Sequence, residues 1–110
     1  MSIAIRGLDK LKADIEKIKK LPQAFGNEFL SRVREKTPVD TGRLQAAWAL
    51  EVNESQKSID VTNKAVNNEG IPYAVFVEFG TEHTRGYFML NRTISESSDI
   101  LRTAKSKVGL

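Results

Sequence analysis

Apolar side chains alternate with small or polar ones along Leu44-Gln45-Ala46-Ala47-Trp48-Ala49-Leu50-Glu51-Val52-Asn53. A period of two is typical of a β-strand with one buried face. After a polar segment, the same alternation returns in Ile59-Asp60-Val61-Thr62. The two runs therefore predict an antiparallel hairpin that carries Trp48 on its apolar face.

An amphipathic helix is predicted upstream of the hairpin, because apolar residues recur there at steps of three and four. These residues are Leu8, Leu11, Ile15 and Ile18. Pro22 should break or kink the helix, since proline lacks an amide donor. A second helical stretch carries Phe25, Phe29 and Val33 and stops at Thr37-Pro38. Pro38-Val39-Asp40-Thr41-Gly42 then reads as a turn between helix and strand.

Downstream of the hairpin, the apolar run Tyr73–Phe79 fits either a buried strand or a short helix, because periodicity cannot distinguish them over so few residues. A carboxy-terminal helix is predicted from the apolar positions Ile94, Leu101, Ala104 and Val108, with Asn91 or Thr93 as its cap. The expected class is α+β: an amino-terminal amphipathic helix, a small antiparallel sheet, and a carboxy-terminal helix on one face. Residues 1–110 are expected to form a single domain with a radius of gyration of about 13 Å.

Composition excludes several classes of site. The chain has no cysteine, so disulfides, thiolate metal sites and cysteine nucleophiles are ruled out. It has no apolar stretch long enough to cross a membrane and no secretory signal, which favours a cytoplasmic location. The aromatic residues at core-like spacings are expected to be buried: Phe25, Phe29, Trp48, Phe76 and Phe79.

The net charge of +3 is the sum of opposed blocks. Residues 1–36 carry nine basic and five acidic residues, residues 37–84 carry three and seven, and residues 85–110 carry five and two. Basic ends of +4 and +3 thus flank an acidic middle of −4. In a head-to-tail assembly these blocks can face each other, so we expect assembly to weaken as salt is added.

No catalytic motif is apparent. His83 is the only histidine and lies in a glycine-bracketed loop without a nucleophile motif, and neither Glu82 nor Glu78 completes a metal-ligand spacing around it. Phosphate-binding glycine patterns are also missing. We therefore expect no enzyme activity, cofactor, metal or small-molecule substrate. The alternative to an assembly role is a basic nucleic-acid-binding module that uses the lysines of the first helix: Lys10, Lys12, Lys17, Lys19 and Lys20.

Two segments of the sequence resemble those of a known protein family. Thr37-Pro38-Val39-Asp40-Thr41-Gly42-Arg43-Leu44, followed by Trp48, comes first, and Tyr73-Ala74-Val75-Phe76-Val77-Glu78-Phe79-Gly80-Thr81 comes later. In this order, and in a chain of this length, they resemble the small tail-completion or head–tail joining proteins of long-tailed double-stranded-DNA phages, also described as minor tail proteins.

The resemblance implies a ring-forming virion subunit, with a hexamer favoured. Such a ring would lie at the neck, between the head connector and the tail-tube or tail-terminator proteins, with genomic DNA passing through its lumen. It would be assembled in the cytoplasm of the bacterial host, without membrane contact.

The resemblance also assigns two groups of residues. The structural motif consists of Pro38, Asp40, Thr41, Gly42, Trp48, Tyr73 and Gly80. Candidate interface residues are Glu78, Phe79, Thr81, Glu82, His83 and Arg85. Trp48 is expected to anchor the sheet on the helix through Phe29 or Val33. Glu78 interrupts an apolar run, so it is expected at an interface or sheet edge, beside a basic partner, or facing solvent.

Overall fold

The computed structural model describes residues 8–39, 42–53 and 58–110. The elements in chain order are α1 (Leu8–Glu35), α2 (Arg43–Ala46), β1 (Trp48–Asn53), β2 (Ser58–Asn63), α3 (Ala74–Phe79), α4 (Met89–Ile94) and α5 (Ser97–Val108). The strands β1 and β2 pair antiparallel, with Trp48 opposite Asn63 and Asn53 opposite Ser58. The α+β class and the hairpin predicted from the sequence are confirmed.

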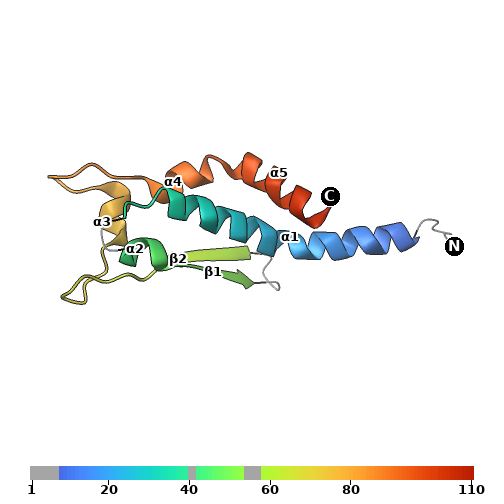
Figure 1. The fold of residues 1–110 in the computed structure, drawn as a ribbon, viewed down its shortest axis with the longest axis horizontal. Coiled ribbons are helices and arrows are strands. Elements are labelled where there is room, and N and C mark those ends of the chain that lie inside the picture. The colour runs from blue at the N-terminus through green and yellow to red at the C-terminus, as the bar shows by residue number, and fades with distance from the viewer. Residues whose placement is uncertain (1–7, 40–41, 54–57) are drawn as a thin grey trace, which may run out of the picture.

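The helix α1 forms the central layer of the molecule (Figure 1). The hairpin packs against one side of α1 and α5 packs against the other, so both long helices lie on one face of the sheet. The core forms where these layers meet, and its buried apolar residues are Phe29, Val33, Leu44, Trp48, Ala65, Met89 and Ile100. The expected packing of Trp48 with Phe29 and Val33 is part of this cluster.

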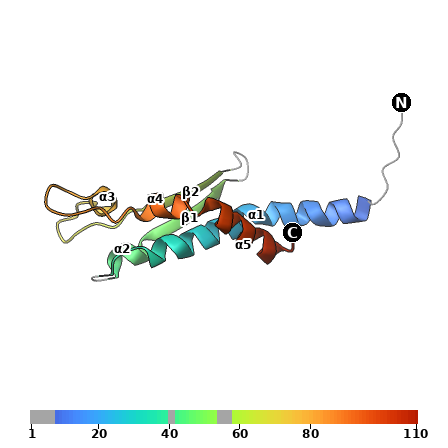
Figure 2. The same ribbon diagram turned by 90° about the horizontal axis from the view of Figure 1, so that it is seen from above.

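The molecule is elongated, contrary to the compact shape expected from its length. Its radius of gyration is 18.7 Å and its principal extents are 67 × 24 × 24 Å. Figures 1 and 2 show the reason: the amino-terminal half of α1 extends beyond the end of α5 and beyond the hairpin. This half of the helix lacks the tertiary cover that the other half receives.

Of the break or kink predicted at Pro22, the structure shows no break, because α1 continues from Leu8 to Glu35 with Pro22 inside it. The axis changes direction about midway along the helix, as both ribbon views show (Figures 1 and 2). Proline removes one helical hydrogen bond and crowds the preceding turn, which bends a helix without having to end it. The Pro22 side chain is exposed, so solvent can hydrate the carbonyl that lost its partner.

The first predicted strand begins four residues too early. Residues Arg43–Ala46 form the short helix α2, and β1 starts only at Trp48. Gly42 precedes α2 with φ 78°, and its carbonyl accepts a 3.0 Å hydrogen bond from the amide of Ala46. Leu44 and Trp48 are both buried. Their spacing of four fits one helical turn as well as it fits a strand, which explains the error.

The predicted carboxy-terminal helix is interrupted and forms α4 and α5. Ile100 and Ala104 face the core, whereas Ile94 is 56% exposed and Leu101 is 36% exposed. Neither predicted cap is correct: Phe88 precedes α4 and Glu96 precedes α5. Thr93 instead lies inside α4, buried, with its hydroxyl donating to the Met89 carbonyl at 2.7 Å.

Arg32 joins α1 to α5 through a group of charges. Its guanidinium contacts Glu28 at 2.9 Å, Glu96 at 3.2 Å and Asp99 at 2.7 Å. Two further ion pairs, Lys36–Glu96 and Lys107–Glu28, extend the network along the same boundary. Only 15% of the Arg32 side chain is exposed, so these contacts are less screened than ordinary surface pairs.

Candidate assembly interface

The short helix α3 carries its apolar side chains on the outside. Val75 is 66% exposed, Phe76 is 55% exposed and Phe79 is 66% exposed. The segment is helical, so positions i, i+1 and i+4 share one face, and here that face points to solvent. The prediction that Phe76 and Phe79 belong to the core is therefore wrong. An exposed apolar helix face of this kind marks a protein interaction surface.

Glu78 is the buried residue of α3, with only 5% of its surface exposed. Its Oε1 atom accepts a 2.8 Å hydrogen bond from the amide of Leu90, and Oε2 accepts a 3.2 Å bond from the amide of Asn91. Both amides belong to the first turn of α4, where helical N–H groups have no partner within the helix. The negative charge also suits a helix amino terminus.

The structure thus contradicts three of the expectations for Glu78, and its place at an interface stays a prediction. It neither faces solvent nor pairs with a basic side chain, and it does not lie at a sheet edge. Phe88, which precedes α4 with φ 49°, provides no side-chain cap. Glu78 supplies that cap from another helix, and it fixes α4 against α3.

The loop after α3 folds back on the helix. The amides of Tyr87 and Phe88 donate 2.9 Å hydrogen bonds to the carbonyls of Val77 and Glu78. Gly80 and Gly86 lie where the two passes of chain approach each other. A Cβ atom on Gly80 would lie 2.5 Å from the Thr84 carbonyl oxygen, and one on Gly86 would lie 2.5 Å from that of Glu78. Only glycine permits this approach.

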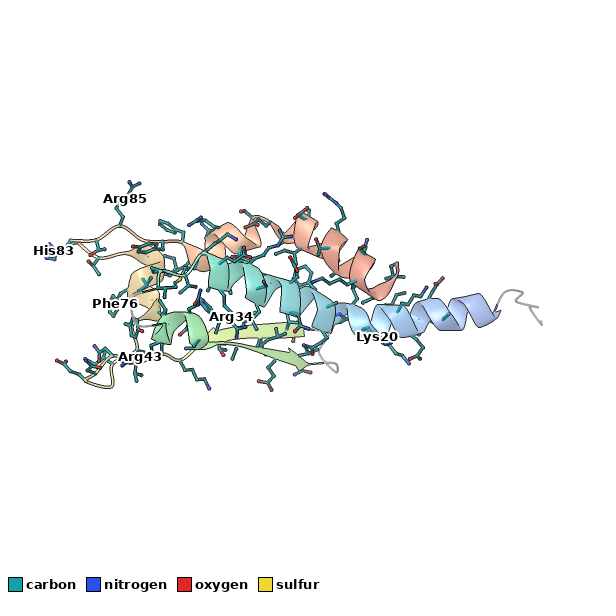
Figure 3. All side chains as sticks on the ribbon, viewed as in Figure 1. Lys20, Arg34, Arg43, Phe76, His83 and Arg85 are labelled. Carbon is teal, nitrogen blue, oxygen red and sulfur yellow. The ribbon has the colours of Figure 1, made fainter. Side chains whose placement is uncertain are left out.

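The other candidate interface residues lie on or beside this loop. Thr81, Glu82, His83 and Arg85 are all exposed. Figure 3 shows His83 and Arg85 at the end of the molecule opposite the free end of α1, with Phe76 nearby. Two exposed aromatic residues follow, Tyr87 at 47% and Phe88 at 41%. Phe79 contacts Phe88 edge to face with ring centroids 6.5 Å apart. The loop and the outer face of α3 therefore form one continuous surface.

An apolar groove of about 540 Å³ opens beside this surface. Its walls come from the sheet, α3 and α4, and they include Trp48, Val61, Val75, Phe79, Leu90 and Ile94. Val75, Phe79 and Ile94 are all more than half exposed. The groove and the outer face of α3 make this end of the molecule suitable for holding another protein.

A family model described as "Bacteriophage HK97-gp10, putative tail-component" matches residues 4–80, well over half of the chain. The chain belongs to this HK97-gp10-like family of bacteriophage tail components. The match confirms the resemblance to phage tail proteins and makes the protein a virion-associated component. Comparisons with curated proteins and with solved structures found no match.

The HK97-gp10-like match spans α1, α2, the hairpin and α3, and it ends at Gly80. The loop tip, α4 and α5 follow the matched region. The buried Glu78 therefore belongs to the matched part of the chain, but both of its hydrogen-bond donors lie outside it. Membership in a family of tail components points to a structural role.

Among the predicted motif residues of this tail component that the structure describes, Trp48 lines the groove. Asp40 and Thr41 lie outside the described residues. Pro38 and Gly42 line a different, smaller depression of about 330 Å³, together with Tyr73. Gly42 and Gly80 both have φ near 80°. Gly42 lies directly before α2 and Gly80 directly after α3, and the structural role predicted for the motif stays a prediction.

Within the described ranges 8–39, 42–53 and 58–110, no set of histidine, aspartate and glutamate side chains is arranged to hold a metal ion. No helix in the same ranges is long and apolar enough to span a bilayer. His83 lies at an exposed loop tip, where its backbone amide donates to the Thr81 hydroxyl at 3.2 Å.

Several residues of the candidate interface were missed in the sequence. Val75 and Ile94 line the groove, and Phe76, Tyr87 and Phe88 extend the exposed surface. If Tyr73–Phe79 had been interpreted as a helix, part of this surface would have been predicted. A helical period places Val75, Phe76 and Phe79 on one face and the polar Glu78 on another. The sequence contained no comparable signal for Ile94, whose exposure depends on the break before α5.

Proposed function

We propose that the protein is a ring-forming subunit at the neck of a long-tailed phage. The ring joins the head connector to the tail-tube or tail-terminator proteins. Genomic DNA passes through its lumen without sequence-specific recognition. A hexamer is the favoured subunit number, and the ring is assembled in the cytoplasm of the bacterial host. Membership in a tail-component family supports the location in the virion.

The observation that carries the proposal is the exposed apolar end formed by α3, the following loop and the groove. Val75, Phe76 and Phe79 are each more than half exposed in the isolated chain. Solvent exposure of so many large apolar side chains in one place favours aggregation unless a protein partner covers them. A subunit of a permanent assembly has such a partner throughout its working life.

The test is to disrupt the gene in the parent phage, supply variants from a plasmid, and count particles by negative-stain electron microscopy. We expect tailless heads and unattached tails without the protein, and intact virions with the wild type. Val75→Ser and Phe76→Ser should fail to restore virions, because they remove the exposed apolar contact. Val39→Ser is the matched control, since Val39 is 63% exposed but lies outside the surface. Normal virions without the protein would refute the proposal.

A basic groove favours a second candidate function, nucleic-acid binding. Lys19, Lys20 and Lys107 line a depression of about 510 Å³ between α1 and α5. If this groove binds duplex DNA, the logarithm of affinity should fall linearly with the logarithm of salt, by about 0.9 for each phosphate contacted. Lys20→Gln should reduce that slope by about one unit. An absence of any DNA shift at low salt excludes this candidate without affecting the first.

A further inference from the structure

We propose that the free amino-terminal half of α1 from one subunit docks in the α3–α4 groove of the next copy of the same chain. This inference rests on the proposed ring and names the two surfaces that build it. One surface is convex and apolar, and the other is concave and apolar. They lie at opposite ends of the same molecule (Figures 1 and 3).

The convex surface is the apolar stripe of α1. Ile15 is 41% exposed and Ile18 is 53% exposed, and their spacing of three places them on one face of the helix. Ile18 lies where the free segment begins and lines a depression with Ile59 and Leu101 of its own chain, whereas Ile15 lies beyond it. The end of α5 lies level with Lys17, because a Cβ atom on Gly109 would contact the Lys17 side chain at 3.6 Å. The helix beyond this point runs past the rest of the fold (Figure 1). An apolar stripe on an uncovered helix is stabilised by a partner surface.

The concave surface is the groove of about 540 Å³ already described. Its wall residue Ile94 lies two positions before Glu96, which pairs with Arg32 of α1 at 3.2 Å. Ile15 and Arg32 are separated along one helix by about 25 Å, at 1.5 Å per residue. A chain therefore cannot bring its own Ile15 to its own groove. Only a second copy can supply that stripe.

Charge favours the same pairing on the walls of the groove that β1, β2 and α3 form. The free half of α1 belongs to the basic block, residues 1–36 with +4, and these three walls belong to the acidic block, residues 37–84 with −4. The fourth wall, α4, belongs to the basic block of residues 85–110 with +3. A contact between different surfaces of identical chains is heterologous, and it closes into a ring when the rotation permits. One such contact covers both uncovered apolar surfaces of the chain.

Disulfide trapping tests the contact directly, because the chain has no native cysteine. The variant Ile15→Cys/Ile94→Cys should form a ladder of covalent multimers under mild oxidation. A disulfide between positions 15 and 94 of the same chain is excluded, because the two Cα atoms of a disulfide must lie within about 7 Å of each other. The matched control is Lys20→Cys/Ile94→Cys. Lys20 is exposed on the same helix but lies about 140° around it from Ile15, so this pair should give no ladder.

Mixing experiments determine whether the contact is heterologous. Ile15→Asp and Ile94→Asp should each weaken self-association by about tenfold or more, since each places a charge in an apolar contact. Together they should form a heterodimer, because each retains the surface that the other lost. If Ile15→Cys alone gives full conversion to covalent dimers, the helices pair with each other and the proposal is wrong.

The trapping is repeated in purified virions that carry the cysteine variants, so a protein that is monomeric in isolation is still tested. Absence of a ladder both in solution and in virions overturns the docking proposal. The particle count in the complementation assay is independent of this result. A protein that joins heads to tails but gives no ladder retains the proposed function and loses the proposed contact.

Discussion

The indole nitrogen of Trp48 donates a 2.8 Å hydrogen bond to the hydroxyl of Thr37. That hydroxyl in turn donates to the Val33 carbonyl at 2.7 Å, in the last turn of α1. Both side chains are buried, at 3% exposure for Trp48 and 4% for Thr37. The threonine before Pro38 therefore ties the first residue of β1 to the end of the long helix.

Thr37→Val should destabilise the fold by about 1–3 kcal/mol, because it leaves the buried indole N–H without an acceptor. Thr37→Ser keeps the hydroxyl and should cost less. Urea unfolding measures the difference, and Trp48, the single tryptophan, provides the fluorescence signal. Equal stability of the valine and serine variants would show that the hydrogen bond contributes little.

Glu78→Gln should cost about 1–2 kcal/mol, the usual effect of losing a helix cap. Glutamine keeps one acceptor oxygen, so one of the two amides of α4 loses its partner, and the charge at the helix terminus is removed as well. The matched control is Glu82→Gln on the exposed loop tip, which should change stability by less than about 0.5 kcal/mol. Thermal unfolding by circular dichroism compares the two variants. If Glu78→Gln is as stable as the wild type, the carboxylate is not the cap.

Gly80→Ala should cost about 3 kcal/mol, since it combines a glycine-only backbone conformation with a clash. Gly80 has φ 83° and ψ −179°, and an added Cβ would lie 2.6 Å from the Gly86 amide nitrogen. Gly70→Ala is the control, because Gly70 also has positive φ, 78°, but has open space around it. This variant should cost about 1 kcal/mol. Similar losses for the two would mean that the loop moves to relieve the clash.

Acid should loosen the contact between α1 and α5. The hydrogen bond from Lys107, followed by that from Arg32, lowers the pKa of Glu28 below its ordinary value of 4.5. Arg32 lowers the pKa of Asp99, and Lys36 lowers that of Glu96. A carboxylate with a lowered folded pKa stabilises the fold above its unfolded value, and this stabilisation is lost as pH falls through the folded pKa.

We therefore expect the melting temperature to fall as pH decreases below about 4.5. Asp99→Asn should reduce the steepness of this decline, because one of the three carboxylates no longer titrates. Glu51→Gln is the control, since Glu51 lies on the exposed face of the hairpin. A melting temperature that stays constant down to about pH 3 would exclude a stabilising role for the network.

The sequence predicted the hairpin and the long helix because each has a clear periodicity over many residues. The prediction of secondary structure was wrong where the apolar spacing fits a strand and a helix equally well. Leu44 and Trp48 satisfy both a strand and a helical turn, and Gly42 selects the turn by adopting positive φ. At Pro22 the sequence left a break or a kink open, and α1 bends there without ending.

The candidate interface was predicted only in part, for a physical reason. Phe79 and the loop residues Thr81, Glu82, His83 and Arg85 are all exposed, and their role as interface residues stays a prediction. Phe76 was assigned to the core because a large aromatic residue is usually buried. Glu78 was misjudged because its partners are backbone amides. No side-chain pattern in a sequence records such partners.

The hydrogen bonds from Leu90 and Asn91 to Glu78 also bear on how the fold can be divided. A fragment that stopped at Gly80 would retain the carboxylate but lose both donors, leaving a charge in an apolar setting without compensation. We therefore expect residues 8–80 alone to fold less stably than the whole chain, although they contain the long helix and the hairpin. Every residue except proline supplies a backbone amide, so substitutions at positions 90 and 91 keep these donors, whereas a change at Glu78 removes the carboxylate that they hold.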